Sequence, residues 1–83
     1  MELLHKYEAC LTEIRAGSLE GSTLRSLELF LSHKMFELSN FWNFEMASSS
    51  DTVIKRRLCF FERELTTVEN ILISRGILEH AIA

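Results

Sequence analysis

The strongest constraint on the fold is a row of apolar residues that repeats at helical spacing through the middle of the chain. Successive members are separated by 3, 4, 4, 3, 4 and 4 residues. The row consists of Leu24, Leu27, Leu31, Met35, Leu38, Trp42 and Met46. This spacing places every member on one face of an α-helix. It therefore predicts a long helix over about residues 23–47.

A second row of the same kind follows a short polar segment. Its steps are 4, 3, 4, 3 and 4 residues, through Ile54, Leu58, Phe61, Leu65, Val68 and Leu72. The pattern predicts a helix over about residues 52–75. The chain contains no proline, the residue that interrupts helices most strongly, so both helices can run without a break.

A shorter helix is predicted near the N-terminus, over about residues 2–16. Its apolar face consists of Leu3, Leu4, Tyr7, Leu11 and Ile14, with Cys10 beside them. Gly17 can end this helix in a left-handed conformation. Gly76 interrupts the last row, and the tail at 76–83 either docks on the rest of the chain or continues as helix. The 83 residues suffice for one domain, which we expect to span 1–83.

These elements predict an all-α fold, a long antiparallel helical hairpin with a shorter third helix at its N-terminal end. The turn at 48–51 is short, and short connections make sequential helices lie antiparallel. The first helix spans only about 22 Å, against about 37 Å for each of the others, at 1.5 Å per residue. It can therefore cover only the half of the hairpin that lies away from the turn.

An exposed apolar patch is expected at the turn end of the hairpin. Phe30, Phe41 and Phe44 flank the first long row, and Val53 and Phe60 flank the second together with Arg57. We expect Phe41, Phe44, Val53 and Phe60 to be exposed in a lone monomer, because the first helix does not reach them. Exposed apolar patches mark partner sites. The predicted partner-binding residues are Phe30, Phe41, Phe44, Val53, Phe60 and Arg57.

Catalytic, metal and cofactor sites are not indicated. His33 and Glu37 are four residues apart, a workable ligand spacing, but this signal is weak and we interpret them as an exposed polar pair. Cys10 and Cys59 are interpreted as two reduced, buried thiols, with one disulfide as the alternative. The sequence contains no phosphate-binding loop and none of the motifs G-x-S-x-G, H-E-x-x-H and C-x-x-C. We therefore expect no enzyme activity, no cofactor and no bound metal.

Charge bears on the class of partner. The net charge of −3 disfavours a general nucleic-acid binder, which normally carries a basic face. The run Lys55–Arg57 is the one basic cluster, and it either contacts an acidic or phosphorylated partner or forms a solvated face. No apolar stretch approaches the length of a membrane helix, so we expect a cytoplasmic protein without membrane association.

The segment from Glu64 to Ile73 alternates acidic and amide residues with aliphatic ones. Together with the small size and the predicted hairpin, it resembles the closing helix of the E-component co-chaperones of type III secretion needles. The resemblance covers the last two predicted helices, and no invariant motif supports it. It implies a cytosolic co-chaperone that joins a helical partner to hold the needle subunit. No functional residue is transferred from that family.

Three functions are compatible with the sequence. The first is an adaptor or co-chaperone that binds another protein through an apolar face, with type III secretion as the setting that the resemblance implies. The second is a small transcription or stress modulator that acts on a regulator or on nucleic acid. The third is a structural protein that associates with itself as a homodimer.

Overall fold

A computed structural model describes residues 2–17 and 21–78 of the chain, and its described part is built entirely from helices and their connections. The all-α class is therefore confirmed. The elements are α1 (Glu2–Ala16), α2 (Ser22–Asn40), the π-helical turn η1 (Phe41–Glu45), the 3-10 turn η2 (Met46–Ser48) and α3 (Asp51–Ser74). The bounds of α1 are the residues expected from the sequence, and those of α3 differ by one residue at each end.

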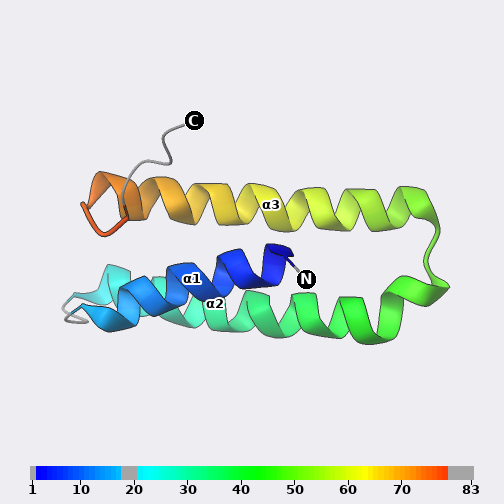
Figure 1. Ribbon diagram of the computed structural model, residues 1–83, viewed down its shortest axis with the longest axis horizontal. Helices are drawn as coiled ribbons and strands as arrows, with labels where there is room; N and C mark the ends of the chain where they lie inside the picture. Colours follow the sequence, from blue (N-terminus) through cyan, green and yellow to red (C-terminus); the bar gives the residue numbers. More distant parts are fainter. Residues whose placement is uncertain (1, 18–20, 79–83) are drawn as a thin grey trace.

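The long helices α2 and α3 run side by side in opposite directions and are joined at one end by η1, η2 and a short turn (Figure 1). The shorter α1 lies along α2, and its N-terminus stops well short of that turn. α1 packs most extensively on α2 and also touches α3, whereas the backbones of α2 and α3 approach each other closely at few positions. The two apolar rows thus share α1 as a partner instead of meeting only each other.

The core lies where the three helices meet. α1 contributes Tyr7, Cys10, Leu11 and Ile14. α2 and η1 contribute Leu27, Leu31, Leu38 and Phe41, and α3 contributes Phe61, Leu65, Val68 and Leu72. Most buried members of α2 and α3 come from the two rows identified in the sequence. The burial of Leu31 and Leu65 shows that both helices present the expected face to the core.

The end of α2 differs from the sequence prediction. The regular helix does not continue to Ala47 but gives way after Asn40 to the π turn. A π turn holds more residues than an α turn, so it rotates the side chains that follow. Trp42, predicted for the core, is 46 % exposed, and Phe41 is buried in its place. The hydroxyls of Ser48 and Ser49 then donate hydrogen bonds to the Glu45 carbonyl at 3.1 and 2.8 Å. These bonds give a partner to a carbonyl group at the end of the helical segment.

Both ends of α3 are set by local hydrogen bonds. At its start, the Ser50 hydroxyl accepts a bond from the Val53 amide at 3.3 Å, the usual N-cap arrangement. At its end, Gly76 adopts a φ of 74°. The amides of Gly76 and Ile77 donate back to the carbonyls of Ile73 and Leu72 at 3.0 and 2.9 Å. This is the Schellman motif, in which a left-handed glycine stops a helix.

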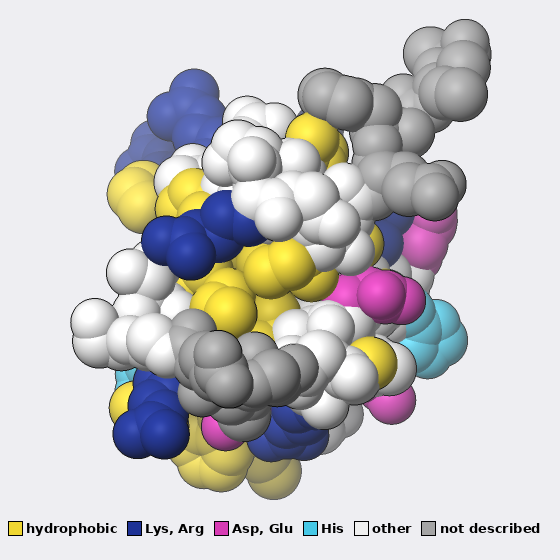
Figure 2. Space-filling view, turned by 90° about the vertical axis from the view of Figure 1, so that its left-hand side faces the viewer, with side chains coloured by type: hydrophobic (Ala, Val, Ile, Leu, Met, Phe, Trp, Pro, Cys, Tyr) yellow, Lys and Arg dark blue, Asp and Glu magenta, His cyan; other side chains and the backbone are white. Residues whose placement is uncertain are grey.

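After this motif the chain turns back onto the core. Ile77 and Leu78 are partly buried and pack against it, so the beginning of the tail docks on the helices. Hydrophobic side chains fill the space between the helices at this end of the molecule (Figure 2). The rest of the tail, residues 79–83, lies outside the described residues.

Candidate protein-binding face

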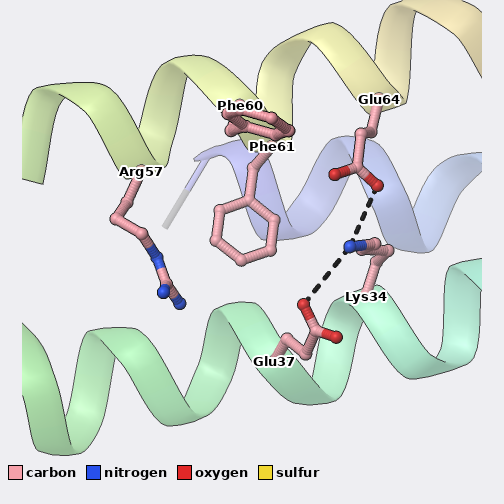
Figure 3. Close-up of a pocket in the computed structure, with 6 residues that line it drawn as sticks. All are labelled: Lys34, Glu37, Arg57, Phe60, Phe61 and Glu64. Carbon is pink, nitrogen blue, oxygen red and sulfur yellow. Dashed lines mark hydrogen bonds and ion pairs between the residues drawn. The ribbon is translucent and has the colours of Figure 1, made fainter.

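The two long helices are covered by α1 on one side and are open on the other. Figure 3 looks at the open side, with α1 behind α2 and α3. A groove between the helices is lined there by Lys34, Glu37, Arg57, Phe60, Phe61 and Glu64. We call it the open groove. Its volume is about 260 Å³, below the roughly 300–1,000 Å³ of typical small-molecule pockets. The groove therefore suits a few side chains of a larger ligand.

The buried ring of Phe61 forms the floor of the open groove, and cations lie over it and over the nearby rings of Phe41 and Phe30. Phe41 and Phe61 are buried, at 1 % and 4 % exposure. The Arg57 guanidinium lies 4.9 Å from the centre of the Phe41 ring and 5.9 Å from that of Phe61. Lys34 Nζ lies 5.9 Å from the Phe61 ring centre and 5.5 Å from that of Phe30. Such cation–π contacts hold the cations above the floor.

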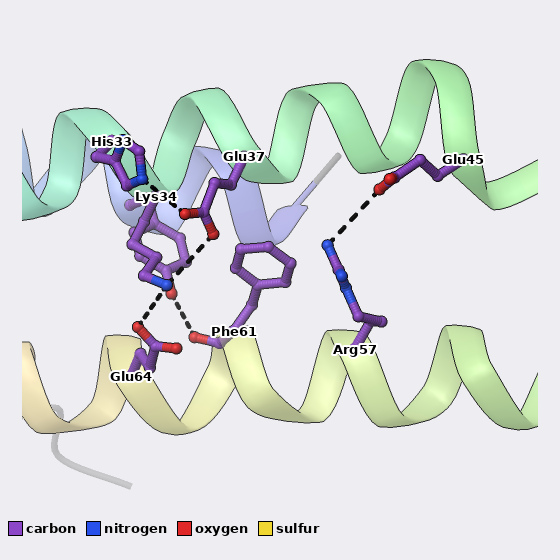
Figure 4. A network of polar contacts seen from close by, with 8 residues as sticks. His33, Lys34, Glu37, Glu45, Arg57, Phe61 and Glu64 are labelled. Atoms are coloured by element: carbon purple, nitrogen blue, oxygen red, sulfur yellow. Dashed lines mark hydrogen bonds and ion pairs between the residues drawn. The ribbon is translucent and has the colours of Figure 1, made fainter.

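Ion pairs connect the walls of the open groove (Figure 4). Lys34 Nζ on α2 lies 3.0 Å from Glu64 Oε2 on α3 and 3.3 Å from Glu37 Oε2 on its own helix. Nearer the turn, Arg57 Nη2 lies 3.6 Å from Glu45 Oε2. Both bridges join α3 to the preceding helical segment, so the charges of the groove also hold its walls together.

The Lys34 ammonium pairs with two carboxylates, those of Glu37 and Glu64. Burial lowers its pKa, but the hydrogen bonds to Glu64 and Glu37 and the charges of these carboxylates outweigh burial, so the pKa is raised above its ordinary value. Lys34 therefore stays charged at neutral pH. His33 Nε2 lies 2.7 Å from the second oxygen of Glu37, which extends the cluster to the rim of the groove.

Tyr7 supports the floor of the groove from behind. It is buried in α1, and its hydroxyl donates a hydrogen bond to the Phe61 carbonyl on α3. Burial, together with the nearby charges of Glu64 and other acidic groups, raises the pKa of Tyr7 well above its ordinary value. The phenol is therefore neutral and acts as a donor, which fixes α1 against the helix that carries Phe60 and Phe61.

The predicted partner-binding residues fall into two groups. Phe44 and Phe60 are 77 % and 62 % exposed, and Val53 is also exposed, as expected. The prediction is wrong for Phe41, which is buried because it lies on the side of the helix that faces α3, where Arg57 covers its ring. Phe30 is half-buried against the core beside Lys34. Arg57 is half-exposed and is held by Glu45.

A second set of exposed apolar side chains lies on α2 and was not predicted from the sequence. Leu29 and Phe36, both exposed, are seven residues apart on α2. At 100° per residue they point about 150° away from Leu31, toward the outer side of the helix. The seven-residue spacing indicates that both residues lie on one face of the helix. This pattern is weaker than the long row because it consists of only two residues.

Of the polar residues considered for chemistry, His33 and Glu37 lie in contact, without a third ligand beside them in the described part of the chain. Within the described ranges, no group of three His, Cys, Asp or Glu side chains has a metal-binding arrangement. Both cysteines are free, Cys10 in the core and Cys59 on the surface, so the interpretation of both thiols as buried is wrong for Cys59. In the same part of the chain, none of the helices combines the length and apolar character needed to cross a membrane.

Comparisons of the chain with protein-family models, with curated proteins and with solved structures found no match. The resemblance to the type III secretion co-chaperones therefore stays a prediction from the sequence.

Proposed function

We propose that this chain is a small protein-interaction module, an adaptor or co-chaperone, that binds another protein along the open groove. The observation that carries the proposal is the exposure of large apolar side chains beside that groove, above all Phe60 on its wall. Burying such a side chain contributes about 1.5–3 kcal/mol, a gain that the isolated chain leaves unused. Solvent exposure of this kind is typical of partner sites.

The form of the groove also supports a macromolecular ligand. Its cations and carboxylates already pair with one another, and its floor is aromatic. A mixed surface with an apolar centre and a polar rim is the usual anatomy of a protein interface. A role in type III secretion would be one case of this function, and it rests on the sequence resemblance alone.

Affinity capture from the cells that encode the protein tests the proposal. The full chain, a Phe60→Asp variant and a Leu29→Asp variant would be compared, each after circular dichroism has shown that it is folded. Both substitutions place a charge at an exposed apolar site, but only Phe60 lines the groove. We expect partners that are retained by the chain and by Leu29→Asp and lost by Phe60→Asp. Equal capture by all three chains would contradict the proposal.

A further inference from the structure

One exposed side of α3 combines apolar and basic residues. Val53, Arg56, Phe60 and Arg63 follow one another at steps of 3, 4 and 3 residues, so they lie on one face of the helix. We call this the basic–apolar face. All of its members are exposed. Arg57 and Glu64, which line the open groove, border the face on the side toward α2.

The positive charge of this face is not balanced locally. In the part of the chain that the structure describes, Arg56 and Arg63 form no ion pair. The carboxylate nearest along the face is Glu64, which Lys34 already binds at 3.0 Å. The other acidic residues of this half of α3 are Asp51 and Glu62. At 100° per residue they point about 160–180° away from Phe60, toward the opposite side of the helix.

The basic–apolar face therefore differs in sign from the chain as a whole, whose net charge is −3. An isolated cationic surface attracts partners of opposite charge and repels cationic ones. Because its two free guanidinium groups flank Phe60 one turn before and one turn after, they are positioned to pair with carboxylates beside whatever covers that ring.

The spacing of the apolar residues favours a helical ligand. Val53 and Phe60 are seven residues apart, about 10 Å along the helix axis, which is also the distance between residues i and i+7 of a second helix. α1 already occupies the other side of the α2–α3 pair. A helix on the open side would complete a four-helix arrangement.

A second copy of the chain fits this face poorly. Parallel packing of two α3 helices would oppose the two copies of Arg56 and of Arg63. Antiparallel packing about Phe60 would place Arg63 of one copy opposite Arg57 of the other, and Arg56 opposite Glu64, a carboxylate that Lys34 already binds. Like charges held at an interface disfavour association. The charge pattern thus selects a foreign ligand over the chain itself.

We propose that the basic–apolar face binds an acidic amphipathic helix of a partner protein. Apolar residues of that helix pack on Val53 and Phe60, and its carboxylates pair with Arg56 and Arg63. This inference rests on the proposed function and specifies the chemistry of its partner.

A displayed peptide library tests the inference. Its members are amphipathic helices of about five turns, long enough to span the face. One face is fixed as Leu, Ile or Phe, and the flanking positions are varied among Glu, Lys and Gln. The full chain is the target, and Phe60→Asp is the counter-target. We expect the peptides that bind the chain and not the counter-target to be enriched in Glu along one edge.

Charge reversal provides the decisive comparison. In an Arg56→Glu, Arg63→Glu double variant, we expect binding of the selected acidic peptides to fall by about tenfold or more, and Lys-containing peptides to be selected instead. Lys55→Glu is the matched control, because Lys55 is also exposed but points about 140° away from Phe60. It should leave the preference for Glu unchanged.

The other outcomes separate this inference from the proposed function. Neutral or basic peptides that require Phe60 would overturn the acidic partner and leave a protein-binding groove in place. A library with no Phe60-dependent binder would overturn both. Tight binding of a labelled single-stranded DNA, lost in the double variant, would also overturn the acidic partner and would assign the face to nucleic acid. Concentration-dependent dimers that dissociate in Phe60→Asp would assign it to a second copy.

Discussion

At the scale of single residues, the core is apolar apart from the polar atoms of Tyr7 and Cys10, and the Tyr7 hydroxyl has a defined role. Among the described residues, no polar or charged side chain other than the Tyr7 phenol and the Cys10 thiol enters the buried set. The Tyr7 hydroxyl finds its partner on α3, 54 residues along the chain. A buried polar group is tolerated only when it is hydrogen-bonded. Tyr7 therefore specifies how α1 sits against α3, which purely apolar contacts would leave less defined.

Replacing Tyr7 by Phe tests this role. The variant keeps the ring but leaves the Phe61 carbonyl without the phenol, so we expect a loss of about 1–2 kcal/mol in the free energy of unfolding. Urea denaturation followed by circular dichroism measures it. Thr12→Ala, which removes an exposed hydroxyl bonded within α1, is the control and should change stability by less than about 0.5 kcal/mol. Equal effects of the two substitutions would refute the role of Tyr7.

The two thiols should differ sharply in reactivity. Cys59 is exposed, whereas Cys10 is 2 % exposed and its pKa is raised to about 11 by burial and by the charges of Glu69 and Glu13. Since the thiolate is the reactive form, we expect a thiol reagent at neutral pH to modify Cys59 quickly and Cys10 only after unfolding. The absorbance of the chromophore that the reagent releases gives the number of thiols modified. Cys59→Ala should abolish the fast phase.

At the scale of elements, the regular parts of α1, α2 and α3 were predictable because each carries several apolar residues at helical spacing. The end of α2 was not. The extrapolated row includes Trp42 and leaves Phe41 on its flank, whereas the structure exposes Trp42 and buries Phe41. α1 does not reach this end of α2, whereas α3 does, and Phe41 lies on the side of the helix that faces α3, under Arg57. Tertiary contact here overrides the local pattern.

Gly76 is an element-scale feature with a measurable contribution. An L-residue in its left-handed conformation costs about 1–2 kcal/mol, and its φ of 74° is what allows Ile77 and Leu78 to turn back onto the core. We expect Gly76→Ala to lower the free energy of unfolding by about 1 kcal/mol. Thermal denaturation followed by circular dichroism would show a lower midpoint.

Gly17→Ala is the control for this measurement. Gly17 has no positive φ, so the left-handed helix end predicted there is wrong. An added Cβ would make only an ordinary contact, at 3.9 Å from the Ile14 carbonyl oxygen. The substitution should be neutral or slightly stabilising, because alanine has fewer unfolded conformations than glycine. A loss at Gly17 as large as that at Gly76 would show that the conformation of Gly76 is not the cause.

At the scale of the whole molecule, the candidate site was predictable in outline and not in detail. The short reach of α1 follows from helix lengths, and this indicated that apolar residues near the turn would be exposed. Phe44, Val53 and Phe60 are exposed accordingly. The pairing of Lys34 with Glu64, and of Arg57 with Glu45, depends on how α2, η1 and α3 align in space. The spacing of residues along one helix does not reveal which charges of different helices meet. That Arg56 and Arg63 form no ion pair among the described residues is therefore known only from the structure.

The same assembly makes the protein sensitive to alkali. The pKa values of Cys10, Tyr7 and Lys34 are all raised in the folded chain. The folded state therefore holds these protons to higher pH than the unfolded state does. The stability that they contribute is present below the unfolded values and is lost as pH rises through the folded ones. For Cys10 this interval runs from 9.0 to about 11, and the loss across it is on the order of 2 kcal/mol.

Urea denaturation at about pH 7, 9 and 10.5 would measure the decline, and a Cys10→Ala variant isolates one part of it. Alanine leaves a small cavity, so this variant is less stable at every pH. Its stability should nevertheless fall less steeply than that of the native chain above pH 9.0, where the unfolded thiol begins to ionise. Cys59→Ala, at an exposed position, should keep the native slope. If all three proteins lost stability in parallel, ionisation of the buried thiol would not contribute, and Tyr7 and Lys34 would have to account for the whole decline.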